Sequence, residues 1–151
     1  MGTASARVVL SLSALALANL CLADGELDAH RARWHAAGIL EYQYRYQKVC
    51  ECHREKPADT IVSVSQGRVV DVRYDREDFL AEIAIAKESY KWFRTVEDLF
   101  MLVERALERQ ALVRVSYEPD LGYPTSIFID YDKAMVGEEV ELLVLGLQQG
   151  D

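Results

Sequence analysis

The sequence predicts an α+β fold, a two-layer sandwich in which an antiparallel sheet of about six strands carries two main helices on one face. Two patterns point to it. Two segments place apolar residues at helical spacing, and each is followed by three segments in which apolar and polar residues alternate with a period of two. The predicted order is therefore α-β-β-β-α-β-β-β, which suggests two similar halves that share one sheet.

The first half is predicted to start with a helix over residues 26–37. This segment contains no Pro or Gly and ends at Gly38, a suitable residue for a helix C-terminus. From residue 40 onward the period changes to two, which indicates a strand with one buried, aromatic face. The residues expected on that face are Leu40, Tyr42, Tyr44 and Tyr46.

A hairpin is predicted next. Residues 60–66 and 68–74 are rich in β-branched side chains, and Gln66-Gly67 supplies the turn between them. The alternation along the two strands puts four valines on the inward side: Val62, Val64, Val70 and Val72.

The second half repeats this order. Thr95 is a suitable N-cap for a helix that runs to Arg109, and acidic residues in its first turn suit the positive end of the helix dipole. Strands are predicted over residues 112–117, 125–131 and 140–147, with a turn-rich connection at 118–124.

The hydrophobic core is expected between the sheet and the two helices. Its predicted members come from both halves, so the two halves are expected to fold as one unit. They are Trp34, Tyr42, Tyr44, Val62, Val64, Val70, Leu99, Phe100, Val103, Val115, Ile127, Ile129 and Leu142.

Four residues outside the regular elements form a candidate binding surface. Tyr90 and Trp92 lie just before the second helix, and Tyr123 and Pro124 end the turn-rich connection. An exposed aromatic patch is typical of a contact site for a partner. The alternative is that these side chains seal the sheet edge or pack over a turn, because large aromatics are usually buried.

Residues 1–23 have the pattern of a secretion signal. Arg7 gives a positive start, an apolar run follows, and small residues at Cys21 and Ala23 favour cleavage before Asp24. The run is too short and too often interrupted for a membrane anchor, which needs about 20 apolar residues. We therefore expect residues 24–151 to be a single soluble domain in the periplasm or outside the cell. A lipoprotein anchored through Cys21 is the alternative, which Leu20 before the cysteine disfavours.

The chain is acidic, and this limits its partners. Its net charge is −8, and Arg7 is the only charged residue of the leader, so removal of the leader gives −9. This charge argues against nucleic acid and against anionic membrane surfaces. No Ser-His-Asp, phosphate-loop or zinc-protease motif occurs, so neither a catalytic residue nor a cofactor is predicted.

Five stretches of the chain resemble one known family. They are the Tyr-x-Tyr strand that runs into Cys50-Glu51-Cys52, the Val-x-Val hairpin with Gly67, residues 95–100, the run from Val115 to Gly122-Tyr123-Pro124, and residues 127–130. In order and spacing they are similar to the bacterial domain-of-unknown-function family 6174, from Trp34 to about Leu145. The resemblance implies an exported protein or lipoprotein without an established activity. The chain departs from the family pattern at His53, where Pro is common, and at Gly137, where Asp is expected.

Cys50 and Cys52 are the only cysteines left after removal of the leader. Export to an oxidising compartment and an even cysteine count favour a structural disulfide between them. In a regular strand the two Cα atoms would lie about 6.6 Å apart, so the bridge requires a local bend. Two alternatives stay open: thiol–disulfide exchange, and binding of Cu(I) or Zn²⁺ with His53.

The function predicted from the sequence is that of an exported cell-envelope domain, a non-catalytic binding or structural module. An open face or edge of the sheet is expected to receive an envelope partner. The rival hypothesis is a thiol-redox or metal-handling protein centred on Cys50 and Cys52.

Overall fold

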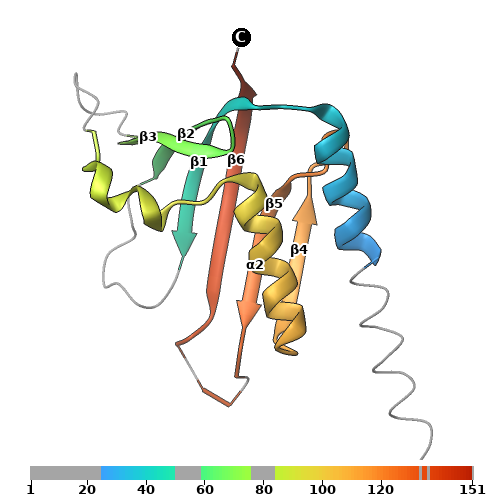
Figure 1. Cartoon of the computed structure of the whole chain (residues 1–151). Coiled ribbons are helices and arrows are strands. Elements are labelled where there is room, and N and C mark those ends of the chain that lie inside the picture. Colours follow the sequence, from blue (N-terminus) through green and yellow to red (C-terminus); the bar gives the residue numbers. More distant parts are fainter. Residues whose placement is uncertain (1–24, 50–58, 76–83, 133, 136, 151) are drawn as a thin grey trace, which may run out of the picture.

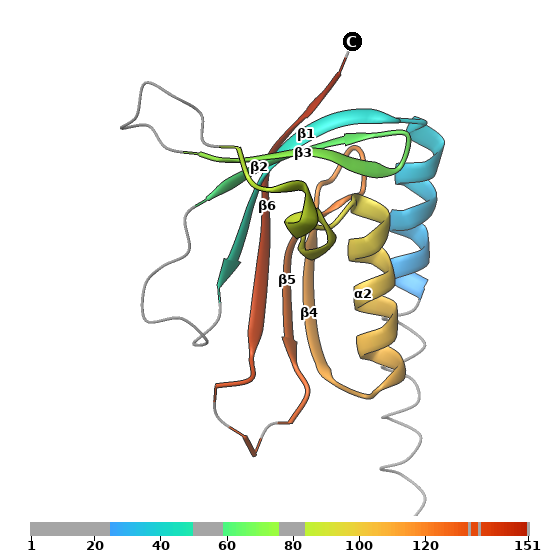
Figure 2. The ribbon, with the colours of Figure 1, turned by 60° about the vertical axis from the view of Figure 1, so that its left-hand side comes forward.

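The computed structural model describes residues 25–49, 59–75, 84–132, 134–135 and 137–150. Within these residues, six strands form one antiparallel sheet, and helices pack on one of its faces (Figures 1 and 2). The predicted α+β fold and the order α-β-β-β-α-β-β-β are confirmed. No helix in the described part of the chain is both long enough and apolar enough to cross a membrane.

The sheet joins two three-stranded meanders through its centre. The strand order is β3-β2-β1-β6-β5-β4, so β1 and β6, from opposite ends of the chain, are neighbours. This seam is the place where the two halves meet in the sheet (Figure 1). The strands are β1 (Glu41–Val49), β2 (Thr60–Ser65), β3 (Arg68–Tyr74), β4 (Leu112–Tyr117), β5 (Pro124–Asp130) and β6 (Val140–Gln149).

The helix layer begins and ends where the sequence predicts. Residues 25–37 are helical, and Gly38 ends the helix in the left-handed region, with φ of 63°. The second helix, α2 (Val96–Glu108), starts at Thr95 with a reciprocal capping box. The Thr95 hydroxyl oxygen accepts from the Asp98 N–H at 3.1 Å, and the Asp98 carboxylate accepts from the Thr95 N–H at 2.9 Å.

Three tyrosines of β1 tie the sheet to the start of α2. The Val96 N–H donates to the Tyr42 hydroxyl oxygen at 2.9 Å, and the Tyr44 hydroxyl donates to the Arg94 carbonyl oxygen. The Tyr46 ring packs against Phe93, with ring centroids 6.1 Å apart. The aromatic face predicted for this strand therefore both fills the core and satisfies backbone groups at the helix entry.

The predicted core is confirmed with two differences. Val70 is 50% exposed rather than inward, because β3 has an extra residue opposite the Ser63–Val64 step of β2. This β-bulge shifts the alternation by one residue, so Val69 packs against the core in its place. Val115 is only partly buried.

The prediction for Leu40 is also wrong. Its side chain is 54% exposed, and it precedes the first residue of β1, so the alternation of the strand does not include it. The buried face of the strand therefore starts at Tyr42.

Truncation of Phe100 is expected to cost about 3–5 kcal/mol of unfolding free energy. The ring is fully buried and stacks on Tyr117, with centroids 6.4 Å apart, so Phe100→Ala leaves a cavity between α2 and the sheet. Chemical denaturation measures the loss. Phe128→Ala is the matched control, since Phe128 lies half-buried on the opposite face and its removal should cost less. Equal losses would show that α2 does not carry the core as described.

The buried tyrosines predict unfolding in alkali. Burial raises the pKa of Tyr42 and of Tyr46 to about 12 and raises the pKa of Tyr44 well above its ordinary value. In the unfolded chain these phenols ionise at about pH 10. The folded state therefore holds these protons more tightly, so the contribution of these tyrosines to stability should be constant below about pH 10 and fall as the pH rises toward about 12. Phenolate absorbance should reach its full value only together with the loss of near-ultraviolet circular dichroism; full phenolate absorbance with that signal intact would contradict this.

Candidate functional site

One face of the sheet carries no main helix. The helix of residues 25–37 and α2 both pack on the face that holds the β1 tyrosines, and Figure 2 shows neither of them on the opposite face. Because side chains alternate along a strand, Gln43 and Arg45 of β1 must point to that opposite face. We call it the open face, and its side chains follow two rows across the strands.

The first row is polar and connected. Cross-strand pairing aligns Asp71, Ser63, Gln43 and Gln148 on β3, β2, β1 and β6. Arg73 donates to the Gln43 side-chain carbonyl at 3.3 Å, and the Gln43 amide nitrogen donates to the Gln148 carbonyl oxygen at 3.0 Å. A guanidinium has only donors, so Arg73 fixes which end of Gln43 is oxygen, and this in turn fixes the orientation of Gln148.

The second row combines a cation with apolar neighbours. Pairing aligns Arg73, Ile61, Arg45 and Leu145 across the same four strands. The Nε atom of Arg45 forms a salt bridge with Asp75, and the Arg45 side chain is 46% exposed. Arg45 is therefore paired with an aliphatic residue on each side, Ile61 on β2 and Leu145 on β6, and its guanidinium is held at one edge by a carboxylate.

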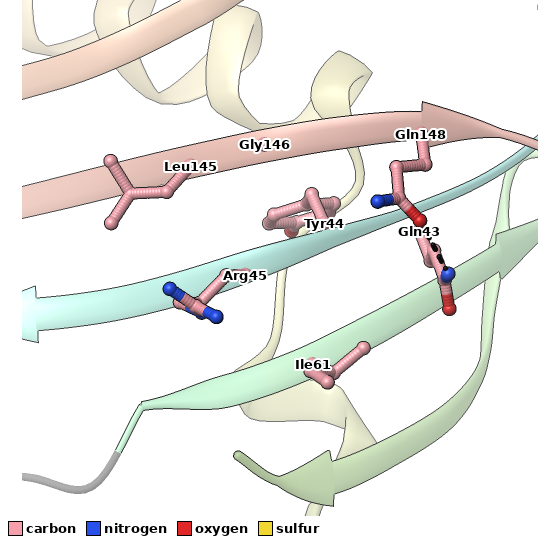
Figure 3. Close-up of a pocket in the computed structure, with 7 residues that line it drawn as sticks. All are labelled: Gln43, Tyr44, Arg45, Ile61, Leu145, Gly146 and Gln148. Carbon is pink, nitrogen blue, oxygen red and sulfur yellow. Dashed lines mark hydrogen bonds between the residues drawn. The ribbon is translucent and has the colours of Figure 1, made fainter. Parts of the chain in front are cut away.

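A β-bulge at Gly146 opens a hollow between the two rows. The β1–β6 register shifts between Gln43 and Arg45, where β6 contains an extra residue, and Gly146 adopts a left-handed backbone with φ of 58°. An added Cβ at Gly146 would meet no atom within 4 Å. The resulting hollow has a volume of about 210 Å³ and is shown in Figure 3, where Gln43 and Gln148 face each other across the seam.

The rim of this hollow presents hydrogen-bond donors. The Gln148 amide group and the terminal nitrogens of Arg45 have no hydrogen-bond partner among the described residues, whereas the Gln43 and Gln148 carbonyl oxygens are both engaged. The open groups are thus N–H donors beside aliphatic walls. Such donors are chemically matched to a group that brings oxygen acceptors.

A second hollow of about 260 Å³ lies where the N-terminal helix, the β2–β3 turn and the start of α2 meet. Its polar pair is His35 and Glu97, whose side chains contact at 2.8 Å and are both well exposed. Trp34, Tyr42 and Thr95 line it, but they already serve the core and the helix cap. Within the described residues, no group of three or more histidine, cysteine or acidic side chains is placed to hold a metal ion.

The candidate binding surface predicted from the sequence is not assembled. Tyr123 and Pro124 are buried, and Tyr123 packs edge-on against Trp34 with centroids 6.0 Å apart. Trp92 is 70% exposed beneath the Lys91 ammonium, in the 3-10 helix η1 (Lys87–Trp92). The Tyr90 hydroxyl donates to Asp71 at the end of the polar row.

Two further predictions fall outside the described part of the chain. Cys50 and Cys52, with the neighbouring His53, are not among the described residues, and neither is the leader of residues 1–23. The disulfide and the two alternatives to it therefore stay predictions.

The sequence does not predict the open-face residues as a site, because outward polar positions of a strand are normally solvated. One signal was present in the sequence: Gly146 lies inside a predicted strand, and an isolated Gly there often marks a bulge. The partners of Gln43, by contrast, come from β3 and β6, and their register is not visible in the sequence.

The comparisons with known proteins agree with the resemblance described above. The model of the "Family of unknown function (DUF6174)" matches residues 26–149. No curated protein matches the chain. The matched region contains both hollows and all six strands.

Gly146→Asn should fill the hollow at little cost in stability. Asn tolerates the left-handed region and the space above Gly146 is open, so the unfolding free energy should change by less than about 1 kcal/mol. Gly146→Val should lose about 1–3 kcal/mol, because a β-branched residue is strained there. Thermal melts compare the two; equal losses would contradict an open, left-handed site.

Proposed function

The chain belongs to DUF6174, a family of unknown function, and from this premise we propose that it is an exported module of the cell envelope. It binds a partner on the open face of its sheet and catalyses no reaction. The observation that carries this proposal is the hollow at Gly146, with donors of Arg45 and Gln148 on its rim that no described residue engages.

The hollow favours binding over a purely structural role for this face. Side chains that only stabilise a sheet pair with neighbouring side chains, as Arg73 does with Asp71 of its own strand and with Gln43 of β1. At the seam, the bulge separates the rows and leaves donors directed at solvent. Bulges recur at sites where a sheet positions groups for binding.

The β3 edge of the sheet is covered, which supports a binding surface on the open face and not at this edge. Residues beyond β3 cover its outer side: the Ile85 N–H donates to the Val72 carbonyl at 2.9 Å, and Ala84 bridges Arg73. An incoming strand would have to displace this cover.

The leader pattern of residues 1–23 supports export to the periplasm or the medium as a soluble protein. We expect the mature chain to start at Asp24, because small residues precede it at the cleavage positions. Amino-terminal sequencing of the protein recovered from the envelope measures this. A lipid-modified Cys21 would show a lipoprotein, and a chain that keeps residues 1–23 would refute export.

The binding face can be located by crosslinking in intact cells. A photoreactive amino acid in place of Leu145 should give a discrete adduct, because this side chain is 40% exposed at the hollow. The adduct should disappear when Gly146→Asn is added and persist with Gly67→Asn. Gly67 is the matched control because it also has a left-handed backbone and open surroundings, in the β2–β3 turn.

Two further variants separate the rival hypotheses. The photoreactive residue at Trp92 tests the exposed aromatic segment, and adducts from Trp92 alone would move the binding surface there. Cys50→Ser/Cys52→Ser should leave the Leu145 adduct unchanged. Loss of the adduct in that variant would favour the redox or metal hypothesis over the open face.

A further inference from the structure

We propose that the hollow at Gly146 takes the C-terminal residue of a peptide, with its carboxylate at Arg45 and Gln148 and its aliphatic side chain against Ile61 and Leu145. This rests on the proposed function, since it names the ligand of the same site.

The donors select a ligand rich in acceptors. Nε of Arg45 is held by Asp75, which leaves the outer edge of the guanidinium directed away from that salt bridge. Gln148 uses its carbonyl oxygen to accept from Gln43, so its two N–H groups remain. Both groups line the hollow, and a carboxylate has two oxygens, so it offers one acceptor to each. Hydrogen bonds between charged partners are about twice as strong as neutral ones.

The aliphatic walls and the volume of the hollow fit a single residue of the ligand. A hollow of about 210 Å³ is smaller than the pockets that enclose a whole small molecule, which span about 300–1,000 Å³. It therefore holds the end of a larger ligand. Ile61 and Leu145 flank Arg45 in the same row, so apolar contact is available directly beside the cation.

This neighbourhood distinguishes a C-terminus from an acidic side chain. In a C-terminal residue the carboxylate and the side chain are attached to the same Cα, so one residue satisfies the cation and the apolar walls together. An internal Asp or Glu brings a carboxylate with no apolar group beside it. Gly146 lets the incoming backbone approach β6 closely, because no Cβ stands in the way.

Two peptides test the assignment on the purified protein. We expect acetyl-Ala-Ala-Leu with a free carboxylate to shift the backbone amide resonances of Arg45, Gly146 and Gln148 on titration. The same peptide as its C-terminal carboxamide should bind about tenfold more weakly or worse, because the charge-assisted bonds are lost. Binding of the free acid should also weaken with added salt.

An isosteric variant isolates the donors. Gln148→Glu keeps the oxygen that accepts from Gln43 and replaces the N–H donors with a second carboxylate oxygen, so binding of the free acid should be lost with the fold intact. Gln149→Glu is the matched control: it makes the same change of charge one residue away, on an exposed side chain that does not line the hollow. This control should bind the free acid as the unchanged protein does.

Results that contradict the C-terminal assignment differ from results that contradict binding at the open face. Equal affinity for acid and carboxamide, or undiminished binding by Gln148→Glu, would overturn the C-terminal assignment. So would the absence of resonance shifts with either peptide at millimolar concentration. If the Leu145 adduct in cells still depended on Gly146, the open face would remain the binding surface, with a ligand of another class.

Discussion

The attachment of β1 to the start of α2 is the constraint on which the rest of the structure depends. The Tyr42 hydroxyl accepts from a backbone N–H at the helix entry, and the Tyr44 hydroxyl donates to a backbone carbonyl there. Both side chains are buried, so β1 has only one way to face the helix layer. A shift of one residue would bury Gln43 and Arg45 and leave the Val96 N–H without its tyrosine partner. The same contacts that hold the core together therefore direct Gln43 and Arg45 to the open face.

The seam between β1 and β6 adds the second condition. β6 comes from the end of the chain and enters the centre of the sheet, where its apolar residues Leu142 and Val144 must face the tyrosine side. The bulge at Gly146 resets the alternation, so that Leu147 again packs against the core after Leu145 has pointed outward. The extra residue thus has two effects. It extends the core along β6, and it opens the hollow on the other face of the sheet.

The side chains around this hollow are ordered by their partners. The chain of contacts from Tyr90 through Asp71 and Arg73 to Gln43 and Gln148 crosses four strands, and each group constrains the next. Side chains that are held in place before a ligand arrives lose little conformational entropy on binding. A preorganised set of donors beside aliphatic walls supports the proposal that the open face binds a partner, within a family whose description assigns no activity.

The sequence by itself determined the elements, their order and the inward face of most strands, because these depend on local properties: period, capping residues and turn residues. Thr95, Gly38 and the three β1 tyrosines behave as their local patterns predict. Only the tertiary structure decided the pairing of β1 with β6, the two bulges that turned Val70 outward and Leu147 inward, and the burial of Tyr123. The physical reason is that register and bulges are settled by contacts between residues as far apart as Gln43 and Gln148, and no local pattern carries that information.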